Sequence, residues 1–490
     1  MENCSQIQIK SIEKASHTLK KLLAALLAFI MLFAAACKFG DIDFDVTKAP
    51  QQQTQEPTQE PAHEKTAADA AFEAVDREVF ISVVTSSGLT FHQFVKDAAS
   101  FGIAEEDIER GWGELSQEAD AADFAENAEM RKKLSEIDRS QLSYRNRIAY
   151  DNLVLNLKLS DEIHAVPDAY YYNEPLTVFN GEHTMLPLML SMYEISSAED
   201  AENYVLLLED APRYIGQIEQ FEREKAAKGL FMTENALNKV LESCIKFAET
   251  GNNCFLIGFF EDEMASAEFE ISEQQKTALL ERSRNSIINE LLPAYRSLAN
   301  TLEQLRPQCG SFAGACMRGV DAKDYYAAAI KSNAACNAEY SSMADELSES
   351  ISSVYAKLVK IILTDSNAMK DYEKNMTSGN VEKDVEYLKE LIDGIYPQIP
   401  EQSIQYVTIP AEDFSPAAYM ISAFDDPTRN VVLLNPTAED DTMLFTLAHE
   451  CFPGHLYQTQ YFRSLDGLPL SQQLCAPTGY SEGWAVFSEL

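Results

Sequence analysis

The chain has 490 residues, of which 46% are hydrophobic and 24% are charged, a composition typical of a large globular protein. Its formal net charge of -39 at pH 7 is far from typical. Because such a surface repels phosphate backbones and anionic headgroups, we expect no nucleic-acid partner.

The first 36 residues carry the pattern of an export signal. Lys20 and Lys21 precede an apolar run from Leu22 to Ala36, which is short for a membrane span and suits the core of a signal peptide. The run ends in FAAAC, so small residues stand directly before Cys37. This ending resembles a bacterial lipoprotein signal, in which the cysteine is lipidated and becomes the new N-terminus. A plain signal peptide with a chance cysteine and an uncleaved anchor are the alternatives.

Residues 37–66 form the predicted tether. The segment includes APQQQTQEPTQEPAHEKT, which is rich in glutamine, proline, glutamate and threonine and holds almost nothing apolar. Because such a composition cannot bury enough surface to offset its chain entropy, we expect a disordered linker. A lipidated cysteine followed by a flexible linker predicts a protein held at the extracytoplasmic face of the cell membrane.

Residues 67–490 predict a mainly α-helical domain. From Ala67 to Met376 apolar residues recur at three- and four-residue steps, while glycine and proline are scarce. After a further helix near residue 384, the pattern changes to short β-rich stretches. These stretches are Ser403–Pro410, Ala417–Phe424 and Asn430–Asn435. We therefore expect a large helical domain with a small antiparallel β-sheet. The last stretch is either an edge strand that pairs with an extended peptide or a plain core strand.

The stretch LAHECFPGHLYQ, which follows the predicted sheet, carries the strongest functional signal. It resembles the zinc-peptidase motif H-E-x-x-H, but the chain reads HECFPGH from His449 to His455, with two additional residues before the second histidine. On a straight helix this spacing sets the histidines about 120° apart and roughly 9 Å along the axis, too far for one ion. Pro453 removes a backbone donor and Gly454 frees the backbone, so the helix must kink or bulge there. A bulge of two residues would restore the facing of the histidines.

A third ligand candidate stands on a later helix. The stretch YSEGWAVFSE supplies Glu482, and with His449 and His455 it would hold Zn²⁺ and leave one position open for water. Glu450, beside a ligand but not itself one, would take the proton of that water as a general base. Glu489 follows about two turns after Glu482, on nearly the same helix face. It either orients a ligand histidine through a hydrogen bond or is a solvated carboxylate.

Together, HECFPGHLYQ and EGWAVFSE resemble the bacterial domain of unknown function 885 family, and the similarity extends over roughly Ala67 to the end. Members of that family look like divergent zinc metallopeptidases of the gluzincin type, with an HE-x-x-PGH signature. The EGWA stretch is also similar to the NEGFA segment of zinc aminopeptidases, in which the glutamate is the third ligand. The resemblance therefore implies a gluzincin-like fold, a Zn²⁺ cofactor and Glu482 as a metal ligand.

The leading functional hypothesis is a cell-surface zinc peptidase that hydrolyses extracellular peptides with metal-activated water. One alternative is a non-catalytic lipoprotein that captures peptides on the same scaffold. Another is a purely structural surface protein, which would leave Glu450 unexplained. The expected partners are a peptide substrate and, through the lipid, the membrane. The pattern does not predict the substrate-binding residues, the choice between exopeptidase and endopeptidase action, or the oligomeric state.

The sequence also predicts a fragment. It stops at Glu489-Leu490 in the middle of an expected helix, with no glycine, asparagine or proline to end that helix. Trp484, Phe487 and Leu490 would form an apolar stripe with no following element to bury it. The family resemblance would place a further helical segment after the EGWA helix, with a donor for the oxyanion. We therefore expect weak metal binding and little activity from the 490-residue form.

Overall fold

The structure is a computed structural model that describes residues 63–334, 339–364, 377–408, 416–436, 443–474 and 477–489. The predicted signal peptide, Cys37 and most of the predicted linker lie outside these residues. Helices make up most of the described chain, and three short strands form one sheet. The expected mainly α fold with a small sheet is therefore confirmed. Among the described helices, none is both long and apolar enough to cross a membrane.

The N-terminal helices start at residues whose side chains cap them. They are α2 (Ala67–Val84), α3 (Gly88–Phe94), α4 (Ala98–Phe101), α5 (Gln117–Ser135) and α6 (Tyr144–His164). Each cap accepts a backbone N–H of the first turn through its side-chain oxygen, which satisfies a donor that the helix itself cannot. The caps are Thr66, Ser87, Asp97, Ser116 and Ser143. Helices α2, α5 and α6 then pack around Phe72, Leu134 and Leu153.

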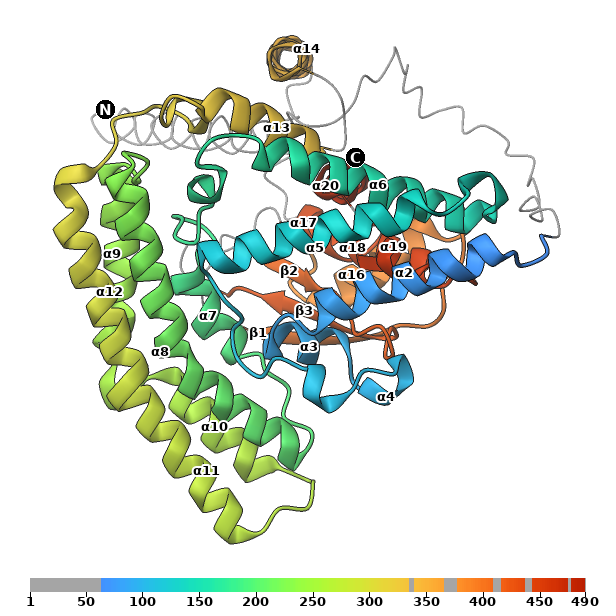
Figure 1. The fold of residues 1–490 in the computed structure, drawn as a ribbon. Coiled ribbons are helices and arrows are strands. Elements are labelled where there is room, and N and C mark those ends of the chain that lie inside the picture. The colour runs from blue at the N-terminus through green and yellow to red at the C-terminus, as the bar shows by residue number, and fades with distance from the viewer. Residues whose placement is uncertain are drawn as a thin grey trace, which may run out of the picture.

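Six helices from the middle of the chain form a separate bundle beside the sheet (Figure 1). They are α7 (Glu182–Leu190), α8 (Ala198–Ala227), α9 (Glu234–Ala248), α10 (Phe255–Ser266), α11 (Glu273–Ser286) and α12 (Leu292–Leu305). Helix α12 packs against both α8 and α9. The bundle encloses the largest apolar cluster among the described residues, with Tyr204, Phe260 and Tyr295 almost fully buried. Periodic apolar faces explain this packing, because each helix buries one stripe.

The sheet is mixed, with the order β1-β3-β2. β1 (Ser403–Thr408) runs parallel to β3 (Arg429–Leu434), and β2 (Ala417–Met420) runs antiparallel to β3. The expectation of a purely antiparallel sheet was therefore wrong for the β1–β3 pair. The edge-strand alternative for Asn430–Asn435 was also wrong, because β3 is the central strand. Alternation of apolar residues predicts strands but not their order, since both strand directions give the same pattern.

The remaining helices surround the sheet and carry the sequence motifs. They are α13 (Ala322–Ala334), α14 (Tyr340–Thr364), α16 (Val381–Ile392), α17 (Met443–Glu450), α18 (His455–Arg463), α19 (Leu470–Leu474) and α20 (Thr478–Ser488). A second apolar cluster joins α16, α17 and α18 to one face of the sheet, around Val432, Leu447 and Leu456. Helix α20 packs against α13, α17 and α18, and α14 stands apart from the body (Figure 1). The motif helices therefore rest on a core of their own.

Candidate metal centre

The predicted break in the motif helix falls between the two histidines. Helix α17 ends at Glu450 and α18 begins at His455, so the extra residues form a full break that is wider than the expected two-residue bulge. A backbone bond still bridges the break, because Tyr457 N–H donates to the carbonyl of Cys451 at 3.0 Å. The break turns the imidazoles of His449 and His455 toward each other, with ring centroids 4.7 Å apart.

Gly454 allows the two helices to approach each other closely. A Cβ on this residue would lie 1.7 Å from the carbonyl oxygen of His449, far inside van der Waals contact. No side chain other than the hydrogen of glycine therefore fits between α17 and the start of α18. The turn is held from the other side by α20, because Trp484 Nε1 donates to the carbonyl of Pro453 at 2.7 Å. Pro453, Gly454 and Trp484 thus all shape the same turn, which lies between α17 and α18.

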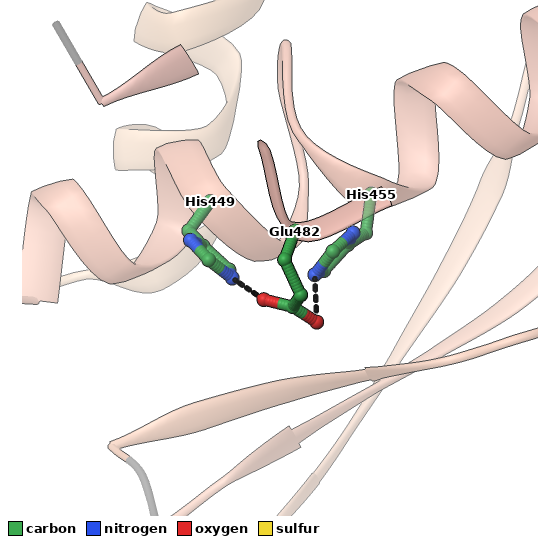
Figure 2. Close-up of side chains that lie close together, drawn as sticks. All are labelled: His449, His455 and Glu482. Carbon is green, nitrogen blue, oxygen red and sulfur yellow. Dashed lines mark ion pairs between the residues drawn. The ribbon is translucent and has the colours of Figure 1, made fainter. Parts of the chain in front are cut away.

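His449, His455 and Glu482 point into a common space between α17, α18 and α20 (Figure 2). Nε2 of His449 lies 3.4 Å from Oε2 of Glu482, and Nε2 of His455 lies 3.6 Å from Oε1. The three donor atoms lie within 4.8 Å of one another. Zinc bonds imidazole nitrogen and carboxylate oxygen at about 2 Å, so donors on one ion lie up to about 4 Å apart. A small closure of the side chains would therefore let all three bind one ion, and the donor set fits zinc.

Glu489 places its carboxylate behind the first histidine. Its Oε1 lies 2.8 Å from Nδ1 of His449, and its side chain is only 10% exposed. A hydrogen bond at Nδ1 fixes the tautomer that leaves Nε2 free to face a metal, and it raises the basicity of the ring. Glu489 therefore lies where it can orient a ligand, instead of standing in solvent.

Glu450 lies beside the three candidate ligands and contacts the sheet. Its Oε2 accepts a hydrogen bond from the backbone N–H of Tyr419 in β2, at 2.9 Å. Burial raises the pKa of Glu450 to about 7, although the bond from Tyr419 acts in the opposite direction. A carboxyl with this pKa exchanges protons readily near neutral pH, which is the property a general base needs.

The two histidines have opposite pKa shifts. Burial lowers the pKa of His455 to about 4. Burial also acts to lower the pKa of His449, but the hydrogen bonds that its ring donates to the carboxylates of Glu482 and Glu489 outweigh it and raise that pKa to about 10. Without a metal, His449 thus carries a proton between two carboxylates. A site that stabilises this positive charge suits a cation, and the proton must leave when a metal binds.

Most of the chain matches a known family. Residues 96–490 match a family described as a bacterial protein of unknown function, DUF885. The chain belongs to the DUF885 family. This membership confirms the family resemblance seen in the HECFPGHLYQ and EGWAVFSE stretches.

The fold of this DUF885 protein is similar to that of solved structures. Among them is the crystal structure of a protein from Colwellia psychrerythraea described as a "putative lipoprotein", with a TM-score of 0.73 and 15% sequence identity. The similarity covers 86% of this chain and 77% of that chain. At such low identity the similarity shows the fold alone. No curated protein matches this chain.

Two contributors to the site of this DUF885 protein were not singled out from the sequence. Tyr419 offers its backbone to Glu450, while its hydroxyl donates to Oδ1 of Asn430 at 2.8 Å. Gln460 of α18 donates to the same oxygen at 2.9 Å and is buried with Asn430. The amide of Asn430 in the otherwise apolar stretch NVVLL is a signal of such a network, because buried polar groups require partners. The network ties β2, β3 and α18 together beneath the site.

Proposed function

We propose that this DUF885 protein is a zinc-dependent peptidase held at the extracytoplasmic face of the membrane by a lipid on Cys37. One observation carries the proposal of peptidase activity. His449, His455 and Glu482 converge from three helices, and the non-ligating Glu450 stands beside them with a raised pKa. A structural zinc site would use four protein ligands, whereas three ligands with an adjacent carboxylate are typical of hydrolytic sites.

The mechanism divides roles among residues of this chain. A bound zinc ion would act as a Lewis acid, which polarises the scissile carbonyl and lowers the pKa of a bound water. Glu450 would take the proton of the attacking water at its carboxylate and pass it to the leaving amine. Glu489 would hold His449 in its ligating tautomer throughout. The buried setting of Glu450 supports this role, because burial raises the pKa of its carboxyl group to about 7, close to neutral pH.

The edge of β2 away from β3, with which no other described strand pairs, supports a peptide as the substrate. Asn435 N–H donates to the carbonyl of Pro416 at 2.9 Å, and backbone bonds alternate along an antiparallel pair. The backbone groups of Ala417 and Tyr419 therefore point away from β3, toward the motif helices. The bond from Tyr419 N–H to Glu450 is consistent with this direction. An extended peptide could pair with this edge and lie across the candidate metal centre.

The location rests on the N-terminal sequence, which lies outside the described residues. The FAAAC ending of the apolar run supports lipidation at Cys37, and the polar segment after it supports a tether. The relative from Colwellia psychrerythraea carries a lipoprotein description of its own. We propose peptides and the membrane as partners, and the charge of -39 supports the absence of a nucleic-acid partner. Mass spectrometry of the mature N-terminus tests the lipidation of Cys37. An unmodified start beyond Cys37 would contradict this location.

Elemental analysis and a peptide-library digest of the purified protein test the peptidase. We expect bound zinc and cleaved peptides, with low zinc occupancy and slow cleavage if the 490-residue form is the predicted fragment. Glu450→Gln should keep the zinc and lower kcat by about 100-fold to 10,000-fold, since the amide cannot accept the proton. His449→Ala should lose both zinc and hydrolysis. Glu390→Gln, on an exposed position of α16, is the matched control and should change neither.

Two outcomes would redirect the proposal. Wild-type hydrolysis in Glu450→Gln would remove the assigned general base. Zinc and tight peptide binding without any hydrolysis would instead favour the alternative of a peptide-capturing lipoprotein on the same scaffold.

A further inference from the structure

A cavity of about 400 Å³ lies on the face of the sheet opposite the motif helices. Its floor is a row of residues in register across the three strands: Gln405 of β1, Val431 of β3 and Met420 of β2. The next row, Tyr406, Val432 and Tyr419, points to the other face and packs with α17 and α18. Successive residues of a strand point to opposite faces. Strand β2 therefore has the cavity on one face and the candidate metal centre on the other.

The walls of the cavity combine apolar and polar side chains, and their apolar part comes mainly from the helical bundle. It includes Met189 of α7, Met192 and Ile195 of the segment between α7 and α8, and Phe259 within α10. Methionine side chains are flexible and adapt to differently shaped apolar partners. The volume is in the range of ligand pockets and is large enough for a bulky side chain.

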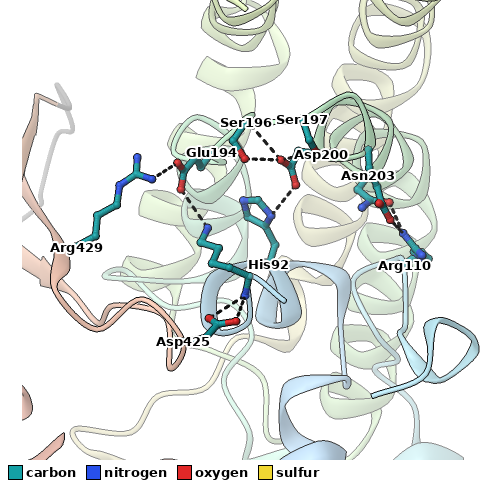
Figure 3. Close-up of polar contacts among 11 residues, drawn as sticks. His92, Arg110, Glu194, Ser196, Ser197, Asp200, Asn203, Asp425 and Arg429 are labelled. Atoms are coloured by element: carbon teal, nitrogen blue, oxygen red, sulfur yellow. Dashed lines mark hydrogen bonds and ion pairs between the residues drawn. The ribbon is translucent and has the colours of Figure 1, made fainter. Parts of the chain in front are cut away.

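An ion-pair cluster at the rim holds the three parts of the cavity together (Figure 3). Glu194 accepts from Lys96 at 3.1 Å and pairs with Arg429 at 2.5 Å. Asp425, in the turn before β3, accepts from the backbone N–H of Lys96 at 3.0 Å. The cluster therefore joins the segment after α3, the segment before α8 and the sheet. Residues far apart in the sequence thus keep the cavity open at a fixed width.

The charges at the rim disfavour acidic side chains. Both cations, Lys96 and Arg429, share Glu194, while Asp425, Glu263 and Asp426 add three further carboxylates. Carboxylates therefore outnumber cations by two, and only the apolar part of the walls favours an apolar side chain. The adjacent His92 stacks on Tyr193 with ring centroids 3.7 Å apart, which closes that side with aromatic surface.

The pleat of the sheet links the cavity to the site. A peptide paired to the edge of β2 with which no other described strand pairs would take over the Tyr419 N–H from Glu450 and continue the pleat, so its alternate side chains would point to the same face as Met420. These side chains would reach the mouth of the cavity, while the peptide backbone lies beside Tyr419 and Glu450. The same edge thus positions the peptide bond and presents a side chain to the cavity.

We propose that this cavity is a specificity pocket, which selects peptides with a large apolar side chain such as Leu, Met or Phe. The proposal rests on the proposed peptidase function, because it takes a peptide along β2 as the ligand. Full burial of such a side chain contributes about 2 kcal/mol, which is roughly a 30-fold preference over alanine.

Met420→Trp tests the pocket by filling it from the floor. We measure kcat/KM for two peptides that differ only in Phe or Ala at the selected position, and we expect the Phe-to-Ala ratio to fall at least tenfold. Zinc content and thermal unfolding should stay close to wild type. Met192→Trp fills the cavity from the opposite wall and should give the same result if the first variant folds poorly. Met317→Trp, an exposed methionine outside the cavity, is the matched control and should leave the ratio unchanged.

A binding measurement separates failure of the pocket from failure of the peptidase. Fluorescence anisotropy with the same two peptides, labelled, is measured on zinc-loaded Glu450→Gln with and without Met420→Trp. A preference for the Phe peptide that Met420→Trp removes supports the pocket, even if wild type hydrolyses nothing. An unchanged preference in a folded, zinc-loaded variant overturns the pocket, whether or not the wild-type protein is a peptidase.

Discussion

Different interactions stabilise two regions of the molecule, the bundle α7–α12 and the motif region around α17, α18 and α20. Within the bundle, consecutive helices bury continuous apolar stripes, and the core is almost entirely hydrophobic. In the motif region, short helices of 8 to 11 residues end at polar contacts with distant segments. Glu450 contacts Tyr419, Pro453 contacts Trp484, and His449 contacts Glu489. The bundle is stabilised by non-directional burial, whereas the motif region depends on a few directional contacts.

The two regions should therefore tolerate substitutions differently. Burial spreads its free energy over many residues, so a substitution that leaves the apolar core of the bundle filled shifts its stability little. A directional contact that positions a metal ligand has no substitute nearby. We therefore expect matched substitutions to have unequal effects in the two regions.

The two glycines Gly454 and Gly216 give the sharpest contrast. A Cβ at Gly454 would overlap the carbonyl of His449, whereas a Cβ at Gly216 on α8 meets nothing within 4 Å. Gly454→Ala should destabilise the protein by more than about 3 kcal/mol and abolish zinc binding, because α17 and α18 must separate. Gly216→Ala should stabilise it by about 0.5 to 1 kcal/mol through the greater helix propensity of alanine. Chemical denaturation measures the stability of each variant, and elemental analysis measures its zinc content. Equal effects of the two substitutions would contradict the expected difference between the two regions.

A buried carboxylate makes one part of the bundle pH-sensitive. Glu222 on α8 is fully buried with no hydrogen-bond partner for either oxygen, and burial raises its pKa to about 7 while Lys225 acts against the shift. The folded pKa exceeds the ordinary value, so stability is complete below about pH 4.5 and falls as pH rises through 7. Glu222→Gln should gain about 2 to 3 kcal/mol over wild type at pH 8 and little at pH 5.

Denaturation of both proteins at the two pH values measures that gain. Glu242→Gln, an exposed carboxylate on α9, is the control and should shift neither value. A gain of equal size at pH 5 and pH 8 would mean that ionisation of Glu222 is not its cause.

The contact of Glu489 with His449 should tune metal binding. Glu489→Gln keeps the size of the side chain but weakens the hydrogen bond to Nδ1. We expect a 10-fold to 100-fold lower zinc affinity. Competition with a chelator of known affinity measures the loss. Unchanged affinity would show that the carboxylate does not orient the ligand.

Trp484 should give the smallest effect. Trp484→Phe keeps an aromatic ring against Tyr457 but removes the donor to the carbonyl of Pro453. We expect a loss of about 1 kcal/mol, the net value of one buried hydrogen bond, with at most a few-fold change in zinc affinity. Chemical denaturation checks the first number and chelator competition the second. A loss as large as that of Gly454→Ala would mean that packing of the indole, and not its bond, holds the turn.

The helices and the residue types of the candidate site could be predicted from the sequence alone. Helical hydrogen bonds join residues four apart, so apolar periodicity within one segment is enough to predict α8, α9 or α12. The HECFPGH stretch and Glu482 predicted which side chains meet, because few combinations of residues bind a metal. Pro453 and Gly454 likewise predicted a break in the helix, since both act on the local backbone.

Only the tertiary structure decided the strand order, the partners of the site and the cavity. Parallel pairing of β1 with β3 depends on a contact between strands that are not consecutive, and no local pattern records it. The bond from Tyr419 to Glu450 joins a strand to a helix through a backbone group that every residue carries. The cavity is lined by Lys96, Glu194 and Arg429, which meet from three separate segments. Such contacts are fixed by how the whole chain packs, which is why a single sequence does not display them.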